Sequence, residues 1–484
     1  MPLYLAIDLG TTGCRSILYD AKLREVGNSY REYGLFTPRE KWAEQDANLW
    51  WALTLETAKE AIAASGLPAA EIRGVSVSSQ GITVVPVDAD FRPLCNALSW
   101  LDVRAGEQAA SLERAFGTRD MFTLTGKRIH EAYTLPKVLW LRENCPGIYD
   151  AAHKLLMPMD FLLARLTGRC ATDHTMASGT LMYDIRNAKW SDRVLEGVGV
   201  PLEKLPALLW SGEAVGAVLP EVARELGLRE DCVVAVGAQD QRCASLGAGL
   251  GEGVMTISLG TAAAVCRTWD RPHTEGDTRI GWSAYVRPGA WVTEGVINTA
   301  AASMRWLRNE MFPGMSYAAI DQEARRALEA GGGLLFYPYL NGPSSPDFYP
   351  DSQGCFLGAN LATRRGDFAL AVMEGVAFQI RILLEAMRSA GSVHAISLFG
   401  GGANSDLWCQ IIADATGLDI AVPETAEVAS VGAAMLAGIG AGEFSWDALP
   451  EVGTRKRYRP GSARARYARL YERYREAEFR LWRE

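Results

Sequence analysis

A glycine-threonine turn whose groups could hold a phosphate occurs twice in this sequence. The copies are residues 7–13 and 257–263, and each lies between two apolar runs, so each is expected to be a β-hairpin. The tips have little side-chain bulk and offer backbone N–H groups and hydroxyls, which is what a phosphate needs. The first copy carries Asp8, an oxygen ligand suited to Mg²⁺, where the second carries Ser258. The repeat predicts two related lobes that close on one polyphosphate.

The first hairpin brings further phosphate-binding groups together. Gly10 leaves the backbone accessible, Thr11 and Thr12 supply hydroxyls, and the Arg15 guanidinium can neutralise β/γ-phosphate charge. A plain hairpin with a polar tip is the alternative, but it explains neither the recurrence nor the carboxylate at Asp8.

The second hairpin contributes Gly260 and Thr261, and a third glycine cluster follows at residues 400–402. This cluster comes after an apolar run and precedes a helix capped by Asn404 or Ser405. Missing side chains at Gly401 and Gly402 would let an adenine approach the backbone. A tight strand-to-helix turn is the alternative. The chain has neither a dinucleotide fingerprint nor a GxxxxGK[ST] loop.

A candidate general base is Asp240. The apolar run 232–236 leads through Gly237 into Asp240, so this carboxylate is expected at the carboxyl end of a strand, ahead of the domain junction, where a cleft should open. A turn or helix-capping aspartate is the alternative.

Trp100, Asp102 and Arg104 are candidate sugar-binding residues. They alternate along an extended run, so all three are expected to face one side and hold a polyol by stacking and hydrogen bonds. A surface tryptophan beside a salt bridge is the alternative. The five histidines are scattered, which argues against a histidine nucleophile or metal site.

Strand-like and helix-like runs alternate along the chain, which predicts an α/β architecture. The expected strands are residues 72–77, 83–87, 232–236, 254–259, 395–399 and 420–422, and the expected helices are 49–64, 135–144, 300–311, 369–389 and 405–416. The glycine-rich residues 247–251 mark the domain junction. We therefore expect an N-terminal domain at 1–246 and a C-terminal domain at 247–484.

Composition narrows the class of protein. A chain of 484 residues with 48% hydrophobic and 22% charged residues fits two globular domains, and a net charge of −8 argues against a nucleic-acid partner. Nine scattered cysteines without a CxxC pair indicate reduced thiols and no zinc cluster. No apolar run approaches the roughly 20 residues of a membrane span. We expect a cytoplasmic protein.

The tail from Arg455 to Glu484 differs, with eleven Arg or Lys and four Glu. Its apolar side chains fall close to helical spacing, which favours a docked terminal helix over an RNA-binding tail. These side chains are Tyr467, Leu470, Tyr471, Tyr474, Leu481 and Trp482.

Together these motifs resemble the FGGY carbohydrate kinases, and within that family most closely the xylulose kinases. The similarity covers nearly the whole chain. Besides the segments above, it rests on residues 42–46, 134–140, 158–162, 237–241, 294–306, 374–378 and 430–434. The resemblance implies an α/β chain of two actin-like (ribonuclease H-like) ATPase domains related by duplication, with a cleft between them.

The resemblance also implies roles for individual residues. Asp240 would take the proton from the attacking sugar hydroxyl, and Asp8 would hold Mg²⁺ and its water shell. The phosphates of ATP would be lined by Thr11, Thr12 and Thr261. The residues that would face the sugar are Gln80, Gly81, Trp100, Asp102, Arg104 and Gln241.

Two segments depart from the xylulose kinase pattern. Gly81-Ile82-Thr83 stands where a Met-His pair usually follows Gln80, and Gly342-Pro343-Ser344 stands where Gly-Glu-Arg is usual. A pentulose such as xylulose is the leading substrate, with glycerol, ribulose, fuculose and erythritol as alternatives. A catalytically silent homologue and a nucleotide-switched interaction module are rivals. Expected partners are a small sugar and ATP, with no nucleic acid or membrane, and a homodimer is one possible assembly.

Overall fold

The computed structural model describes residues 1–275, 278–342, 345–349, 351–387 and 393–482. The chain divides into two compact units. Unit 1 contains Met1–Gly247, Trp269–Val292 and Glu427–Glu451, and unit 2 contains Ala248–Thr268, Thr293–Ala426 and Val452–Glu484. The first break lies between Gly247 and Ala248, within the glycine-rich residues 247–251, and two later segments return to unit 1. The domains at 1–246 and 247–484 stay a prediction.

Unit 1 is built on a six-stranded mixed sheet. Its order is β13-β14-β5-β1-β2-β3, formed by Ala214–Ala217, Val233–Gln239, Ile72–Ser79, Leu3–Leu9, Gly13–Asp20 and Glu25–Glu32. The central strands β14, β5 and β1 are parallel, and β1, β2 and β3 are successive antiparallel strands. The carboxyl ends of the three parallel strands therefore meet at one edge of the sheet.

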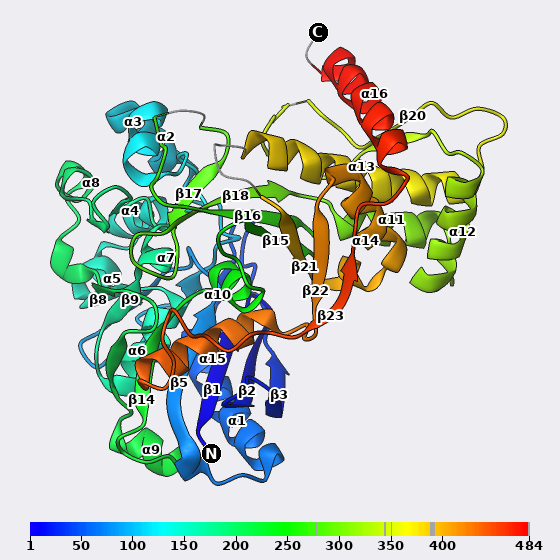
Figure 1. Ribbon diagram of the computed structural model, residues 1–484. Helices are drawn as coiled ribbons and strands as arrows, with labels where there is room; N and C mark the ends of the chain where they lie inside the picture. The colour runs from blue at the N-terminus through cyan, green and yellow to red at the C-terminus, as the bar shows by residue number, and fades with distance from the viewer. Residues whose placement is uncertain (276–277, 343–344, 350, 388–392, 483–484) are drawn as a thin grey trace. The chain divides into compact units, whose positions relative to one another are not determined.

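Helices cover both faces of this sheet. Alternate residues of β1, from Leu3 to Leu9, pack in one core with α1 (Ala47–Ser65) and α6 (Pro158–Thr167). The other face is covered by α10 (Asp240–Gly247) and α15 (Val428–Gly440), and α15 contacts β1, β5 and β14. Figure 1 shows α15 lying across these strands, although it comes from the last segment of unit 1. Asp8 alternates with the core residues of β1 and belongs to the α10 face.

Two glycines are required by close backbone approach. A Cβ at Gly237 on β14 would lie 1.7 Å from the Val77 carbonyl oxygen on β5, and one at Gly432 on α15 would lie 2.0 Å from the Cys243 oxygen on α10. Any side chain at these positions would push the strand and the helix away from their neighbours. Gly237 therefore fixes the strand that leads to Asp240, and Gly432 fixes the helix pair beside it.

The remaining elements of unit 1 are short. The helices are α2 (Gly106–Phe116), α3 (Thr118–Thr125), α4 (Thr134–Asn144), α5 (Pro146–Ala151), α7 (His174–Ala177), α8 (Asp192–Val198) and α9 (Pro220–Leu226). The strands are β4 (Glu44–Gln45), β6 (Val85–Val87), β7 (Ala97–Leu98), β8 (Lys154–Leu156), β9 (Ala171–Asp173), β10 (Tyr183–Asp184), β11 (Lys189–Trp190), β12 (Ala207–Leu209) and β17 (Gly281–Ala284).

Unit 2 repeats the sheet of unit 1. Its strands lie in the order β18-β16-β15-β21-β22-β23, formed by Trp291–Ile297, Ala263–Trp269, Val254–Leu259, Ala395–Phe399, Asp419–Pro423 and Thr454–Tyr458. β16 and β15 are antiparallel, β21 and β22 follow in parallel with β15, and β23 is antiparallel to β22. Unit 1 has the same pattern when its strands are taken from β3 to β13. The predicted duplication is therefore confirmed by the sheet topology.

In unit 2, the helices predicted at 300–311, 369–389 and 405–416 agree with the observed ones to within a few residues, where residues 388–389 lie outside the described residues, and the helix at 317–329 was not predicted. The observed helices are α11 (Ala301–Met311), α12 (Tyr317–Glu329), α13 (Arg365–Ala386), α14 (Asp406–Thr416) and α16 (Arg464–Trp482), with a small sheet of β19 (Leu335–Tyr337) and β20 (Cys355–Leu357). Because buried strands are short apolar runs and helices are longer periodic ones, the sequence distinguishes them well.

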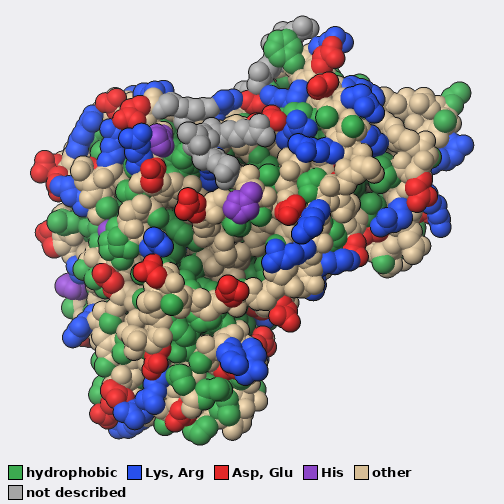
Figure 2. Space-filling view, in the orientation of Figure 1, with side chains coloured by type: hydrophobic (Ala, Val, Ile, Leu, Met, Phe, Trp, Pro, Cys, Tyr) green, Lys and Arg blue, Asp and Glu red, His purple; other side chains and the backbone are tan. Residues whose placement is uncertain are grey.

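The terminal helix α16 docks on unit 2, but by a narrower face than predicted. Tyr467, Tyr471 and Tyr474 are buried as expected, whereas Leu481 is exposed. Glu478 takes the next position on the buried face and accepts a hydrogen bond from Tyr339 at 2.5 Å. Figure 2 shows Lys and Arg side chains gathered around β23, where Lys456 pairs with Asp406 at 2.5 Å. Across the described residues, no helix is both long and apolar enough to cross a membrane.

Candidate active site

Asp8 lies near the carboxyl end of β1, on the face covered by α10 and α15. Its Oδ1 accepts a hydrogen bond of 2.7 Å from the Ser78 hydroxyl on β5. Burial raises the pKa of Asp8 to about 6; the Ser78 hydrogen bond opposes this rise, Glu427 adds to it and Arg15 opposes it.

Asp240 begins α10 directly after β14. Its Oδ1 accepts hydrogen bonds from the backbone N–H of Gln241, at 2.6 Å, and from the amide of Gln239. Burial, followed by the charge of Asp8, raises the pKa of Asp240 to about 7. The side chain is half-buried, so it keeps a route to the surface while being largely enclosed by protein. A carboxylate in this setting can accept a proton near neutral pH.

The register of the parallel strands brings the two carboxylates together. Asp8 on β1 and Ala238 on β14 both pair with Ser78 of the central strand β5. Asp240 follows two residues after Ala238, at the same edge of the sheet. The structure thus unites the two acidic residues that the sequence singled out separately.

The tip of the first hairpin is well defined. The Gly10 N–H donates to the Gly13 carbonyl at 3.0 Å, while Thr11 is half-buried and Thr12 is exposed. Arg15 lies 3.1 Å from the Glu427 carboxylate, just before α15, and stacks over the Tyr30 ring at 4.9 Å. The predicted phosphate ligand Arg15 is therefore paired with an acidic residue of unit 1.

Gln80 follows β5 and is almost fully buried, with 2% of its surface exposed. Its amide nitrogen donates to Gln45 Oε1 at 2.8 Å, and its backbone N–H donates to the Leu9 carbonyl at 2.9 Å. Among the described residues, none donates a hydrogen bond to Gln80 Oε1. Next to it, a Cβ at Gly81 would lie 3.1 Å from Gln239 Cγ, so position 81 borders the residue before Asp240.

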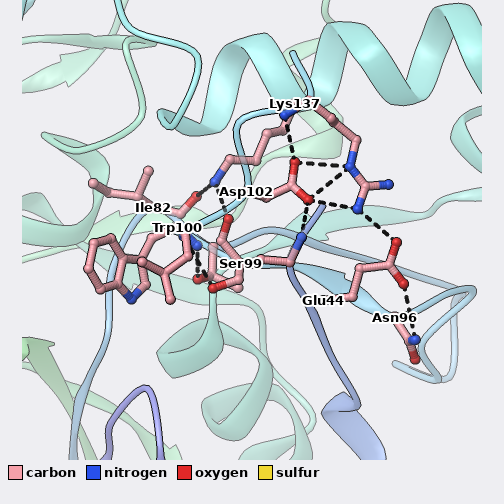
Figure 3. Close-up of polar contacts among 11 residues, drawn as sticks. Glu44, Ile82, Asn96, Ser99, Trp100, Asp102 and Lys137 are labelled. Carbon is pink, nitrogen blue, oxygen red and sulfur yellow. Dashed lines mark hydrogen bonds and ion pairs between the residues drawn. The ribbon is translucent and has the colours of Figure 1, made fainter. Parts of the chain in front are cut away.

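Trp100, Asp102 and Arg104 do not share a face, and this prediction is wrong. Residues 99–102 form a turn closed by the Asp102 N–H and the Ser99 carbonyl at 3.0 Å, so the alternation of an extended chain is lost. Trp100 is 39% exposed and donates from Nε1 to the Thr11 hydroxyl at 2.9 Å. Figure 3 shows its ring directed away from Asp102.

Asp102 and Arg104 form a buried ion pair instead. Arg104 Nη2 lies 2.7 Å from Asp102 and 2.7 Å from Glu44, and its guanidinium stacks 3.5 Å from the centre of the Trp42 ring. The Asp102 carboxylate also accepts the Ala43 N–H at 2.7 Å. This is neither the predicted sugar contact nor the surface salt bridge of the alternative. These two charges hold the turn that presents Trp100.

Lys137 on α4 is a functional candidate that the sequence analysis missed. It is fully buried and donates to the Ser99 carbonyl at 2.7 Å and to the Ile82 carbonyl at 3.4 Å (Figure 3). Burial, reinforced by Arg104 and opposed by Asp102, lowers the pKa of Lys137 to about 7. Ile82 has a φ of 68°, which is unusual for a β-branched residue. Lys137 therefore joins the segments that carry Gln80 and Trp100, and its place within an apolar helix was the available signal.

In unit 2, the second hairpin and the glycine cluster lie against each other. Cβ atoms at Gly400 and Gly402 would lie 3.0 Å and 2.5 Å from atoms of Leu259, at the end of β15. Gly402 is buried, whereas Gly401, Asn404 and Thr261 are exposed. Thus Gly260, Thr261, Gly401 and Asn404 are gathered around one strand end, and Gly402 serves the packing.

The tip of the second hairpin is fixed by α11. The N–H groups of Ala300 and Ala302 donate to the Thr261 carbonyl at 3.0 and 3.1 Å, and that of Ala301 donates to the Gly260 carbonyl at 3.0 Å. The backbone of this tip is thus held in place, and the Thr261 side chain is exposed.

The residues present fit a magnesium nucleotide better than a metal bound by protein alone. Across the described residues, no three His, Cys, Asp or Glu side chains gather into a metal site. Magnesium is commonly held by one or two carboxylates together with substrate phosphates and water. Asp8, beside a hairpin of glycine and threonine, has the donor type and the neighbours that such a site requires.

Comparison with known proteins agrees with this chemistry. Residues 3–247 match the N-terminal domain of the FGGY family of carbohydrate kinases, and residues 255–441 match its C-terminal domain. The xylulose kinase of Bacillus subtilis (strain 168) is 31% identical over 92% of this chain and 89% of its own length. The xylulose kinase of Escherichia coli (strain K12) is 29% identical over 99% of this chain and 98% of its own length.

The fold is also that of solved sugar kinases. A crystal structure described as a xyloylose kinase from Brucella ovis superposes with a TM-score of 0.92, at 29% identity and 99% coverage of both chains. The two units therefore have the actin-like ATPase fold. The chain belongs to the FGGY family of carbohydrate kinases, and its activity is the ATP-dependent phosphorylation of a carbohydrate.

Proposed function

We propose that this chain transfers the γ-phosphoryl group of MgATP to a terminal hydroxyl of a small ketose, with a pentulose such as xylulose as the leading substrate. The observation that carries the proposal is the placement of Asp240 beside Asp8, at the carboxyl ends of parallel strands. One carboxylate is available to the acceptor hydroxyl, and the other to the magnesium nucleotide.

Asp240 acts as the general base. Its raised pKa of about 7 leaves a substantial deprotonated fraction at neutral pH while increasing its affinity for a proton. The transition state of phosphoryl transfer is loose, so the hydroxyl becomes acidic only as its bond to phosphorus forms. The hydrogen bonds from Gln239 and Gln241 to Oδ1 hold the carboxylate and leave Oδ2 for the hydroxyl.

Asp8 and the first hairpin hold the charged end of the nucleotide. When bound, Mg²⁺ neutralises phosphate charge. Asp8 contributes a carboxylate oxygen to the metal and its waters, and Gly10, Thr11 and Thr12 contribute backbone N–H groups and hydroxyls. Arg15 approaches a phosphate by exchanging its partner Glu427. In unit 2 the nucleotide ligands are Gly260, Thr261, Gly401 and Asn404.

The sugar lies against Trp100, Gln80 and Gly81, with Gln241 as a further polar contact. Trp100 supplies an exposed ring face for stacking, and the unpartnered Gln80 Oε1 suits a hydroxyl donor. The buried Asp102–Arg104 pair supports the Trp100 turn and is no longer proposed to contact the sugar. The xylulose kinases among the relatives support a pentulose.

A spectrophotometric ADP-release screen tests this proposal. The purified chain is assayed with MgATP and xylulose, ribulose, fuculose, glycerol or erythritol, and Asp240→Asn serves as the control for contaminating kinases. We expect xylulose to have the highest kcat/KM and EDTA to abolish the activity. A higher kcat/KM for another sugar would replace xylulose, and sugar-independent ADP release in both proteins would overturn the proposal.

Two features bear on the choice of sugar. Gly81 stands where a larger residue usually follows Gln80, and a Cβ at this position would lie only 3.1 Å from Gln239 Cγ, so a larger side chain here would crowd the residue before Asp240. Of the second departure, Gly342 is described, whereas Pro343 and Ser344 lie outside the described residues. Cytoplasmic location and a homodimeric assembly stay predictions.

A further inference from the structure

Thr11 accepts hydrogen bonds from Trp100, which is proposed to contact the sugar, and from Gln45, which contacts the proposed sugar ligand Gln80. The Trp100 indole Nε1 donates to its hydroxyl at 2.9 Å, and Gln45 Nε2 donates to its backbone carbonyl at 2.7 Å. Gln45 is fully buried in the short strand β4, and Thr11 lies at the tip of the first hairpin. The tip is thus tied to residues 34 and 89 positions away.

The direction of one chain of hydrogen bonds is fixed by chemistry. A backbone carbonyl can only accept, so Gln45 must present Nε2 to Thr11 and Oε1 to Gln80. Gln80 must then donate from its own Nε2, as it does at 2.8 Å, which leaves its Oε1 as the end of the chain. That oxygen is a buried acceptor without a donor among the described residues. Leaving such an acceptor unpaired is unfavourable, so a hydroxyl that donates to Gln80 Oε1 would stabilise the series of hydrogen bonds from Gln80 through Gln45 to Thr11.

We propose that Gln45 is a positioning residue that, together with Trp100, couples sugar binding to phosphate binding through Thr11. A sugar hydroxyl that donates to Gln80 Oε1 holds Gln80 and Gln45 in place, and Gln45 holds the Thr11 carbonyl. A sugar stacked on Trp100 fixes the indole that donates to the Thr11 hydroxyl. Because that hydroxyl oxygen is already accepting, its own hydrogen is directed elsewhere, toward a phosphate oxygen.

This inference rests on the proposed function, since it needs a sugar and a nucleotide that bind together. It predicts that each ligand tightens the other, because both use the same ordered hairpin tip. Trp100 stacks and also donates a hydrogen bond, and the Trp100→Phe variant separates these roles by keeping an aromatic face without the N–H. Gln45→Leu breaks the hydrogen bonds from Gln80 through Gln45 to Thr11, at a residue that contacts neither ligand in this proposal.

Isothermal titration calorimetry tests the coupling. The non-hydrolysable analogue β,γ-imido-ATP is titrated with Mg²⁺ into the full chain, with and without the sugar that gives the highest kcat/KM in the screen. We expect the sugar to tighten wild-type binding at least about fivefold, as is usual for coupled sites. Trp100→Phe, Gln45→Leu and Thr11→Val should each reduce this factor at least threefold, whereas Thr12→Val should keep it.

A double-mutant cycle separates the coupling from simple damage. If Trp100 acts through the Thr11 hydroxyl, Trp100→Phe with Thr11→Val should lose no more coupling than either single change. The coupling factor is the ratio of the analogue's affinity with sugar to its affinity without sugar. The inference would be overturned if the losses of coupling in the double variant were additive, if the single variants kept the wild-type factor, or if the wild-type factor were one. Trp100 is exposed, so its variant remains informative even if Gln45→Leu fails to fold. Turnover of a sugar with unchanged coupling removes only this inference, whereas the proposed function falls if no sugar is phosphorylated.

Discussion

Asp240 and Asp8 lie at the carboxyl ends of β14 and β1, on either side of β5, and the charge of Asp8 contributes to the raised pKa of Asp240. The pKa is about 6 for Asp8 and about 7 for Asp240, and burial is the larger cause for both. Two enclosed negative charges at one strand edge repel each other, so the site favours either a proton on one carboxylate or a cation beside them. This electrostatic coupling supports the proposed roles of Asp240 as base and Asp8 as metal ligand.

Asp240→Asn should nearly abolish sugar phosphorylation while nucleotide binding stays close to wild type. An amide keeps the size of the side chain but cannot take the proton, and loss of a general base costs about 10²-fold or more in turnover. Single-turnover assays and calorimetric titration with β,γ-imido-ATP would measure both effects. Turnover within tenfold of wild type would return Asp240 to a helix-capping role.

Asp8→Ala should lower turnover and weaken its dependence on Mg²⁺ together. The change replaces the carboxylate beside the first hairpin with a methyl group, which cannot bind a hard cation. Activity measured across a Mg²⁺ titration would show it, with Ser78→Ala as a control that removes only the hydrogen bond at 2.7 Å. An unchanged titration in Asp8→Ala would mean that Asp8 is structural.

The activity should rise with pH through about 7. Asp240 works in its deprotonated form, and its pKa of about 7 lies well above the usual value for an aspartate. When kcat/KM for the sugar is measured from pH 5 to 9, the midpoint of its acid limb should therefore lie near pH 7. That midpoint reports the coupled pair of carboxylates. A limb near pH 4 would show that the enclosed site does not raise the pKa of the base.

Lys137→Met should change how stability depends on pH. The pKa of Lys137 is about 7 in the folded chain and ordinary in the unfolded chain, so the unfolded chain holds more protons between pH 7 and 10. The stability contributed by this site then rises with pH, by up to about 1.4 kcal/mol per pH unit. The melting temperature of wild type relative to Lys137→Met should increase from pH 7 to 9. The exposed Lys22→Met is the control, and equal trends in both variants would contradict the prediction.

Gly432→Ala should destabilise the chain although alanine is the better helix former. Propensity alone favours alanine by about 1 kcal/mol, but the new Cβ would lie 2.0 Å from the Cys243 carbonyl oxygen. Overpacking of this kind costs about 1–3 kcal/mol, so the melting temperature should fall. Gly106→Ala, at the start of α2 with nothing within 4 Å, is the matched control and should be neutral or slightly stabilising. A higher melting temperature in both variants would show that α10 and α15 can move apart at little cost.

The sequence by itself determined the two hairpins, the strand that ends before Asp240, and the long helices α1, α13 and α14. Turn residues and apolar periodicity are patterns of a few neighbouring residues, so they can be recognised in the sequence without knowledge of the fold. The same holds for Asp8 and Thr11 as members of the first hairpin motif, which spans only a few residues, although their hydrogen-bond partners lie far away in sequence. The sheet order of each unit then confirmed the duplication that the repeat had indicated.

Only the tertiary structure decided which polar residues remain available and which are used in packing. Asp102 and Arg104 have the residue types of a sugar site, but Ala43 and Glu44, 59 and 60 positions away, draw them into a buried ion pair. Gln45 carries no local signal and Lys137 only its place in an apolar helix, because their partners, the carbonyls of Thr11, Ser99 and Ile82, belong to distant segments. Pairing and burial depend on contacts between residues far apart in sequence, and residue spacing along one segment cannot report those contacts.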